Sequence, residues 1–255
     1  KTEMKIIISP AKKMIVDTDS LPVRSEPVFL EDTEKIKKYI QTLSYGEAKK
    51  LWSCNDKIAE LNFARFREMD LQKNLTPAIL SYEGIQYQYM APIVFTDNAL
   101  SYIQEHLCIL SGFYGVLKPL DGVVPYRLEM QAKAGVEGAD DLYDFWGSKI
   151  YGNVCDKDRI IINLASKEYS KCVEHYLKPE DIFITCVFGE LREGRVIQKG
   201  TLAKMARGEM VRYMAENNVT DLEQLKSFEG LGYRYEKEIS GEKEYIFLKT
   251  GKSEK

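Results

Sequence analysis

Continuous runs of apolar and β-branched residues predict the strands of a buried sheet. The clearest runs are residues 5–8, 159–164 and 181–188, and each of them is followed by turn-forming or polar residues. A shorter apolar run at 107–110 predicts another buried strand, and residues 77–82 predict a further short one. The chain is therefore expected to contain a sheet with helices around it.

Apolar residues spaced three and four positions apart predict the helices. Residues 31–43 carry this pattern, and residues 44–47 (S-Y-G-E) form the capping box that starts a second, short helix. A third helix is expected to begin at 53–56. We interpret residues 31–68 as a helical subdomain. Further helices are predicted at 97–106, from about 140 to 154, and at 201–217.

Two pairs of segments predict β-hairpins. Residues 181–188 are expected to return as 196–199, and residues 232–239 pair with 243–248 in a C-terminal β-hairpin with one solvated face. The fold class is α/β (mixed α+β), with a central mixed sheet and flanking helices. Residues 4–250 are predicted to form a single domain, and 251–255 a disordered tail.

The segment 107–130 combines its apolar run with special backbone residues. Gly112 and Gly115 allow the backbone to approach another segment closely, while Pro119 and Pro125 exclude a continuous helix. Long loops of this kind inside a domain are more often functional than idle.

Composition sets limits on function. A net charge of −3 means that any polyanion must bind at a local cluster of basic residues. The five cysteines are scattered and there are only two histidines, so neither a disulfide framework nor a histidine-rich metal centre is expected. We predict no metal and no cofactor. The sequence shows neither a membrane span nor a signal-peptide pattern, which predicts a cytoplasmic protein without a membrane partner.

Small polar and basic residues recur where the predicted strands end. Because ligands gather at the carboxyl ends of strands in open α/β sheets, these residues are candidates for one phosphate-binding cleft. Strand ends are also polar simply because loops follow them, and this interpretation remains open. The candidates are Ser9, Lys12, Ser111, Ser166 and Lys167, with Lys204 and Arg207 closing the cleft.

The run Tyr126-Arg127-Leu128-Glu129 places Arg127 and Glu129 on one side of an extended segment, since side chains alternate. They are either a cleft pair for a substrate or a structural salt bridge. No nucleotide-binding, zinc-protease or hydrolase motif is present. The catalytic residues are unknown, with Glu129, Tyr126 and Ser9 as candidates.

Several ordered motifs resemble the YaaA peroxide-stress proteins from about residue 4 to residue 248. The motifs are Ile8-Ser-Pro-Ala-Lys12, Asp56-Lys57 with Asn62-Phe-Ala-Arg65-Phe66, Leu110-Ser-Gly-Phe-Tyr-Gly-Val-Leu-Lys-Pro-Leu120, Pro125-Tyr-Arg-Leu-Glu-Met130, Asp141-Leu-Tyr-Asp-Phe-Trp-Gly147, Ile162-Asn-Leu-Ala-Ser166 with Tyr169, and Ala203-Lys204 with Ala206-Arg207-Gly208. Two positions depart from the family pattern. Lys13 stands where a small hydroxyl residue is expected, and Met205 stands where a second lysine is expected.

The resemblance implies a DNA-binding protein of the oxidative-stress response, with an unusual α/β fold, a basic cleft and a helix–hairpin–helix. The 31–68 block is the first candidate for that element, and the turn at 111–115 is the alternative. Matched by motif, the expected binding residues are Ser9, Lys12, Lys57, Arg65, Tyr114, Tyr126, Arg127, Ser166, Lys167, Lys204 and Arg207.

Three functions follow as hypotheses. The first is DNA binding that limits peroxide damage, with DNA as the partner and no protein partner expected. The second is an enzyme acting on a nucleotide or damaged nucleic acid in the same cleft, so whether the chain is an enzyme stays open. The third is iron handling, for which the sequence offers no ligand set.

Overall fold

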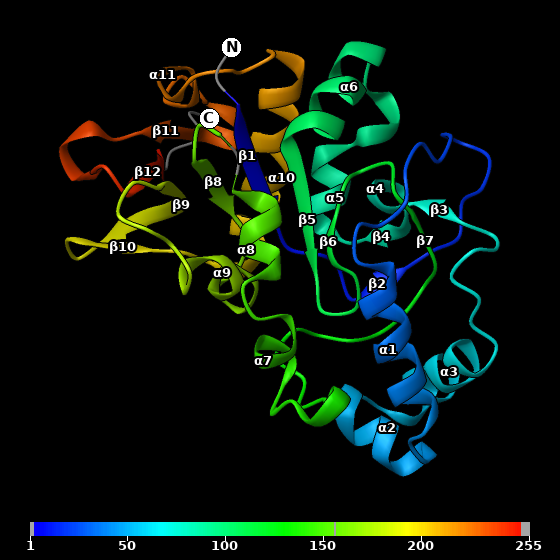
Figure 1. Cartoon of the computed structure of the whole chain (residues 1–255). Coiled ribbons are helices and arrows are strands. Elements are labelled where there is room, and N and C mark those ends of the chain that lie inside the picture. The colour runs from blue at the N-terminus through cyan, green and yellow to red at the C-terminus, as the bar shows by residue number, and fades with distance from the viewer. Residues whose placement is uncertain (1–2, 156, 251–255) are drawn as a thin grey trace.

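The apolar runs form one mixed sheet in the computed structural model, which describes residues 3–155 and 157–250. Its eight strands follow the order β11-β12-β9-β8-β1-β5-β6, and β10 pairs with β9 (Figure 1). The sheet strands are β1 Met4–Ile8, β5 Leu107–Ser111, β6 Gly115–Leu117, β8 Ile160–Leu164, β9 Ile182–Arg192, β10 Arg195–Ile197, β11 Tyr233–Tyr235 and β12 Glu244–Lys249. Two small ladders pair β2 Lys13–Met14 with β4 Tyr82–Glu83, and β3 Thr76–Pro77 with β7 Gly122–Val123.

The centre of the sheet is parallel. Strand β1 pairs in parallel with both β5 and β8, so that Ile8 lies opposite Ile109 on one side and Leu164 on the other. The side chains of Ile6, Ile7 and Ile8 are fully buried, because both faces of the sheet are covered. Each such side chain contributes roughly 1.5–3 kcal/mol to folding through removal of apolar surface from water.

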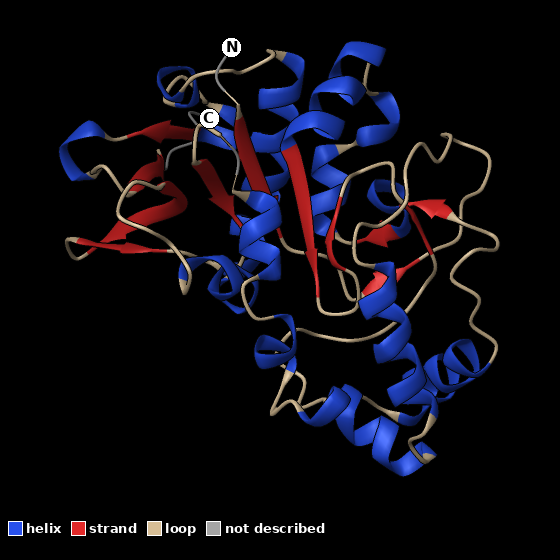
Figure 2. Ribbon diagram, viewed as in Figure 1, coloured by secondary structure: helices blue, strands red, loops and turns tan. Residues whose placement is uncertain are grey.

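Helices cover both faces of the sheet (Figure 2). In Figure 1, α8 lies in front of β1 and β8, and α10 passes behind them, where it packs on α5 and α6. The helices are α1 Leu30–Gln41, α2 Tyr45–Trp52, α3 Asp56–Arg67, α4 Ala78–Ser81, α5 Ile85–Met90, α6 Asp97–His106, α7 Leu142–Trp146, α8 Lys149–Val154, α9 Lys167–Glu174, α10 Gly200–Glu216 and α11 Leu222–Leu225, with 3₁₀ turns η1 Pro92–Val94, η2 Val136–Gly138, η3 Gly230–Gly232 and η4 Lys237–Ile239.

The predicted N-terminal helices are present as α1, α2 and α3, at the end of the molecule away from β11 and β12 (Figure 1). The capping box is confirmed, since Ser44 Oγ accepts from the Glu47 N–H at 3.2 Å and Glu47 Oε1 accepts from the Ser44 N–H at 2.9 Å. The helices α2 and α3 pack on one another. Whether these helices act as a helix–hairpin–helix, or form a subdomain, stays a prediction.

Two predicted elements differ in the structure. Residues 77–82 were expected to form a strand, but Ala78–Ser81 is the helix α4, because a short apolar run does not distinguish a strand from a buried helical turn. The helix expected from about 140 to 154 is two helices, α7 and α8. The chain breaks at Gly147, whose φ of 50° lies in the left-handed region that favours glycine.

The C-terminal hairpin is confirmed, since β11 and β12 pair antiparallel, but its predicted solvated face is wrong. Residues 245–248 are buried one after another. Strand β12 also pairs in parallel with β9, so it lies inside the sheet, and the burial of successive residues shows that both of its faces are covered there. The predicted return after residue 188 is confirmed by the antiparallel pairing of β10 with β9.

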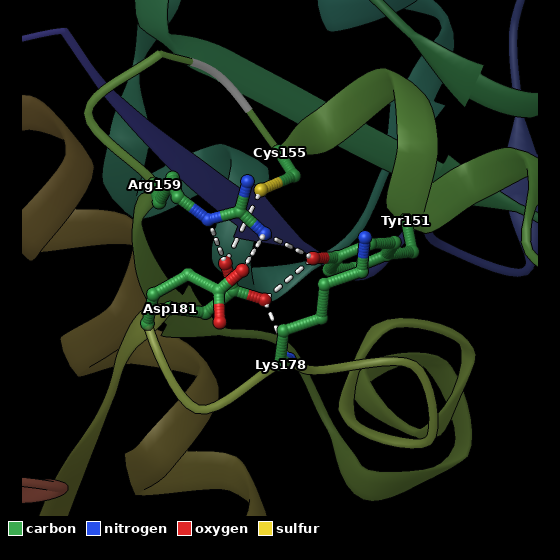
Figure 3. Close-up of polar contacts among 6 residues, drawn as sticks. Tyr151, Cys155, Arg159, Lys178 and Asp181 are labelled. Atoms are coloured by element: carbon green, nitrogen blue, oxygen red, sulfur yellow. Dashed lines mark hydrogen bonds and ion pairs between the residues drawn. The ribbon is translucent and has the colours of Figure 1, made fainter.

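A polar cluster around Asp181 fixes the amino ends of β8 and β9 (Figure 3). Tyr151 donates its hydroxyl to Asp181 Oδ2 at 2.5 Å, and Arg159 Nε donates to Oδ1 at 2.6 Å. Burial alone would raise the pKa of Asp181, but these bonds and the Lys178 N–H together hold that pKa below its usual value. The cluster therefore has a structural role. It lies at the amino ends of the strands, opposite the carboxyl ends of β1 and β8.

No helix in the described part of the chain has the length and apolar character that crossing a bilayer requires. The tail predicted at 251–255 lies outside the described residues.

Candidate functional site

The carboxyl ends of β1 and β8 meet through their first loop residues. Ser9 Oγ accepts from the Ser166 backbone N–H at 2.8 Å and donates to Ser166 Oγ at 3.1 Å. The Ser9 carbonyl in turn accepts from the Tyr87 hydroxyl at 2.8 Å and from the Gln86 side-chain amide at 3.1 Å. The prediction that these strand ends lie together is confirmed, and the contacts hold the Ser9 loop rigidly against α5.

Helix α10 reaches the same edge because Gly208 lets it approach α5 closely. A Cβ atom at Gly208 would lie only 2.1 Å from the carbonyl oxygen of Gln86. No other residue type fits there without moving one of the two helices. One turn or less from this contact, α10 carries Lys204 and Arg207 to the wall of the pocket described below.

The segment after β7 forms another wall. Its side chains alternate, with Tyr126 and Leu128 buried and Arg127 and Glu129 partly exposed, so the predicted common side of the latter two is confirmed. A Cβ atom at Gly112 would lie 2.8 Å from the Leu128 carbonyl oxygen, which is the close approach expected of this glycine. Arg127 and Glu129 do not pair with each other. Glu129 instead forms an ion pair of 3.0 Å with Lys12.

These elements enclose a pocket of about 410 Å³. Besides its charged groups, its wall contains Ser9 and Ser166, the amide of Gln86, and the rings of Tyr87, Tyr126 and Tyr169. Cationic side chains outnumber acidic ones, although the whole chain has a net charge of −3. The charged residues in the wall are Lys12, Lys13, Glu83, Arg127, Glu129, Glu168, Lys204 and Arg207.

Two arginines in this wall have unsatisfied buried nitrogens. The Nε atoms of Arg127 and Arg207 are both inaccessible to solvent and have no hydrogen-bond partner among the described residues. Burial lowers the pKa of Arg207, which is the expected effect of removing a cation from water. Neither arginine is paired with a carboxylate within the described chain. Both side chains are partly exposed in the pocket wall, and a guanidinium group without a carboxylate partner favours an anionic ligand.

The pocket wall also contains a carboxyl group with a raised pKa, that of Glu168. Burial raises the pKa of Glu168, and the nearby negative charge of Glu129 raises it further. The Gln131 N–H, which donates to Glu168 Oε2 at 3.3 Å, and the charge of Lys12 act in the opposite direction. Glu168 therefore holds a proton to higher pH than an ordinary glutamate.

A hydrogen-bonded chain of hydroxyl groups supports Tyr126 from beneath. Ser111 Oγ accepts from the N–H groups of Phe113 at 3.2 Å and Tyr114 at 2.9 Å, so its own proton is directed to the Tyr126 hydroxyl at 2.6 Å. The hydroxyl groups of Tyr126 and Tyr82 share a hydrogen bond of 2.7 Å. Burial raises the pKa of Tyr126 to about 12, so its hydroxyl group stays protonated at neutral pH. The hydrogen-bonded hydroxyl groups hold the Tyr126 side chain in place in the pocket wall.

The structure brings together some of the predicted binding residues and separates others. Lys57 is exposed on α3, and Lys167 is exposed and paired with Glu174 at 3.0 Å. Arg65 is half-buried and lies 3.4 Å from Asn62 Oδ1, while Tyr114 is fully buried and accepts from the Val124 N–H at 3.0 Å. These four lie outside the pocket wall. The predicted binding residues in the wall are Ser9, Lys12, Tyr126, Arg127, Ser166, Lys204 and Arg207, and the catalytic candidate Glu129 lies there with them.

Sequence reasoning missed several pocket residues, among them Gln86, Tyr87 and Glu168. The aromatic segment at 87–89 was visible, but nothing local indicates that α5 packs under the end of β1. Glu168 was one residue from a candidate. The raised pKa of Glu168 results from burial, which cannot be read from the sequence.

Among residues 3–155 and 157–250, no three His, Cys, Asp or Glu side chains gather as a metal site would require. The iron-handling hypothesis therefore has no candidate ligand set in this part of the chain. The cysteines are free thiols.

Comparison with known proteins identifies the family. Residues 4–239 match the family model described as peroxide stress protein YaaA. The chain is 55% identical over 246 residues to a UPF0246 protein of Lachnoclostridium phytofermentans, with 96% of each chain covered. It is 56% identical over 247 residues to one of Desulfitobacterium hafniense, covering 97% of this chain and 98% of that one. A UPF0246 protein of Ligilactobacillus salivarius is 49% identical over 247 residues, covering 97% of this chain and all of the relative. This chain therefore belongs to the peroxide stress protein YaaA family.

Proposed function

We propose that this protein binds DNA through phosphate groups in the pocket at the carboxyl edge of the sheet, and that this binding limits oxidative damage to DNA during peroxide stress. The observation that carries the proposal is the pair of arginines in the pocket wall, Arg127 and Arg207, which form no ion pair with a carboxylate among the described residues. Guanidinium groups bind phosphate oxygens through charge-assisted, often bidentate hydrogen bonds.

The surroundings of the arginines support a phosphate ligand. Lys204 is exposed at the pocket and forms no ion pair among the described residues, so its charge is available to an anion. The pocket also contains Ser166, the residue that precedes α9, and the first N–H groups of a helix favour anions. Phosphate contacts of this kind carry little base sequence information. Binding should therefore depend on DNA structure more than on sequence.

A salt titration tests the proposal. Affinity for duplex, bulged and single-stranded DNA is measured for the wild type and for Arg127→Gln, Lys204→Ala and Arg207→Gln. Each variant should bind more weakly, and the slope of log K against log salt should fall by about 0.9 for each duplex phosphate that the variant no longer binds. Arg212→Gln is the matched control, because Arg212 lies on α10 but pairs with Glu216 at 2.8 Å outside the pocket. Binding that ignores salt, or that survives all three pocket substitutions, contradicts the proposal.

A second function, catalysis on a nucleotide or damaged nucleic acid, is favoured by two of the three carboxyl groups in the pocket. Glu129 forms an ion pair of 3.0 Å with Lys12, whereas burial raises the pKa of Glu168. A carboxyl group with a raised pKa can act as a general acid. Product analysis after incubation with oxidised or mismatched oligonucleotides tests this function. Turnover that Glu129→Gln abolishes supports it, and unchanged substrates count against it.

A further inference from the structure

The pocket at the carboxyl edge of the sheet is the size of a small ligand rather than of a DNA duplex. Its volume of about 410 Å³ is at the lower end of the range of small-molecule sites. A duplex backbone laid across its mouth can contact exposed groups such as Lys204 and Lys12, but it cannot enter a space of this size. Arg127 and Arg207 both line the pocket, so a narrow anionic group that enters it can approach both guanidinium groups.

The carboxyl groups in the wall are not explained by phosphate binding alone. A site built only for a polyanion has no use for the three acidic residues of the wall, Glu83, Glu129 and Glu168. Carboxyl oxygens do, however, accept hydrogen bonds from the amino groups of nucleobases. A ligand that carries a phosphate and also an amino-bearing base satisfies both kinds of group in one pocket.

We propose that the pocket holds one nucleoside monophosphate unit, its phosphate bound by Arg127 and Arg207 and the amino group of its base bound by Glu129 and Glu168. This inference rests on the proposed function where the unit belongs to DNA, since an enzyme or binding protein reaches a base in a duplex by extruding it from the stack. A free nucleotide presents the same chemistry. The two sources are separated by experiment.

The wall is arranged in advance for such a ligand. Tyr87 is fixed by its bond to the Ser9 carbonyl and Tyr126 by its bonds to Ser111 and Tyr82, so the aromatic groups need little reordering. Glu129 is oriented by Lys12. Thymine offers these carboxyl groups no exocyclic amino group, so the geometry predicts selection of adenine, cytosine and guanine against thymine.

The test measures binding of AMP, CMP, TMP and inorganic phosphate to the full chain by calorimetric titration. Wild-type protein should bind AMP and CMP at least tenfold more tightly than TMP. Glu129→Gln should reduce this preference to less than threefold without weakening the binding of phosphate, and Glu168→Gln is a second variant with the same expectation. Arg207→Gln should weaken all four ligands, whereas the control Arg212→Gln should change none. Equal affinity for the nucleotides, or a preference that survives both glutamate substitutions, overturns the inference.

A second experiment tests whether the bound nucleotide belongs to DNA or is free. Duplexes that carry the fluorescent amino-bearing base 2-aminopurine, either in a single-nucleotide bulge or fully paired, are titrated with wild-type protein and with Arg207→Gln. A fluorescence change at the bulge that Arg207→Gln removes, and that AMP competes away, identifies an extruded nucleotide. DNA binding without base preference among mononucleotides leaves the proposed function standing and defeats this inference. If the protein binds mononucleotides with a base preference but does not bind DNA, the inference about the pocket holds with a free nucleotide as the ligand, and the proposed function is wrong.

Discussion

At the scale of single residues, Arg207 is expected to lower the stability of the fold while it strengthens DNA binding. Its Nε is buried without a partner among the described residues, and burial lowers its pKa, so the folded protein carries the cost of an unpaired cation. Arg207→Met should therefore raise the free energy of unfolding by roughly 1 kcal/mol, because an apolar side chain of similar length fills the space. The same substitution should weaken DNA binding about ten- to a hundredfold, the effect of removing one charge-assisted hydrogen bond.

Thermal unfolding and DNA titration of the same preparations check both parts of this expectation. Arg212→Met on the same helix should change neither quantity much, because Arg212 is partly exposed and its ion pair with Glu216 lies at the surface, outside the pocket. A destabilised Arg207→Met protein would mean that Arg207 supports the fold rather than a ligand.

Glu168 should make DNA binding depend on pH. Burial and the charge of Glu129 raise its pKa, so the folded protein keeps this proton at a pH where the unfolded chain, with a pKa of about 4.3, has lost it. The free energy of unfolding contributed by this group thus falls as pH rises from about 4 through the raised folded pKa. Protonation also removes a negative charge from the pocket, so DNA affinity should increase as pH falls through that value.

Glu168→Gln should flatten both profiles, with a stability above the wild type at neutral pH and a difference that closes toward about pH 4. Affinity and melting temperature measured from about pH 5 to about pH 8 at constant ionic strength test this. Glu216→Gln, exposed on α10, is the control. An unchanged pH profile in Glu168→Gln would show that another group titrates.

The sequence predicted some of these residues and not their partners. Alternation placed Arg127 and Glu129 on one side, as observed, because that rule depends only on extended backbone. The pairing of Glu129 with Lys12 could not be predicted, since it depends on how the loop after β1 folds back. Likewise, no local pattern marks the raised pKa of Glu168, which arises from burial.

At the scale of elements, the contact between α10 and α5 positions the pocket. Gly208→Ala adds a Cβ atom 2.1 Å from the Gln86 carbonyl oxygen, so the helices must separate. Overpacking of this kind costs about 1–3 kcal/mol, more than the gain of up to about 1 kcal/mol that alanine brings to a helix. We expect lower stability together with weaker DNA binding, because Lys204 and Arg207 move with α10.

Gly152→Ala in α8 is the matched control. A Cβ atom there meets nothing within 4 Å, so this variant should be as stable as the wild type or more stable, with unchanged DNA binding. Chemical denaturation and DNA titration give the comparison. If Gly208→Ala matches Gly152→Ala in both, the close approach of the two helices is not what holds the pocket.

At the scale of the whole molecule, the sequence predicted elements better than their order. The runs at 5–8, 159–164 and 181–188 are the strands β1, β8 and β9, because fully buried strands need continuous apolar residues. Their sheet order pairs β1 with β5 and β8, which lie far along the chain, and such long-range contacts leave no periodic signal. The insertion of β12 beside β9 is a further case. It buries a face that alternation alone predicted to be solvated.

The separation of the helical block from the pocket leads to a prediction about DNA length. Lys57 is exposed on α3, outside the pocket, and has no ion pair among the described residues. If α1–α3 give DNA a second backbone contact, Lys57→Ala should weaken binding of a duplex of about 30 base pairs, which is longer than a domain of this size, and should not affect mononucleotides. Arg207→Gln should weaken both, and Lys237→Ala in η4, beside β11, should weaken neither. For the long duplex, the slope of log K against log salt should fall by about 0.9 in Lys57→Ala, which corresponds to one phosphate contact.

Two outcomes would contradict this prediction. If Lys57→Ala weakened long and short ligands equally, Lys57 would contribute to binding in the pocket itself. If it weakened neither, α1–α3 would not contact DNA through Lys57.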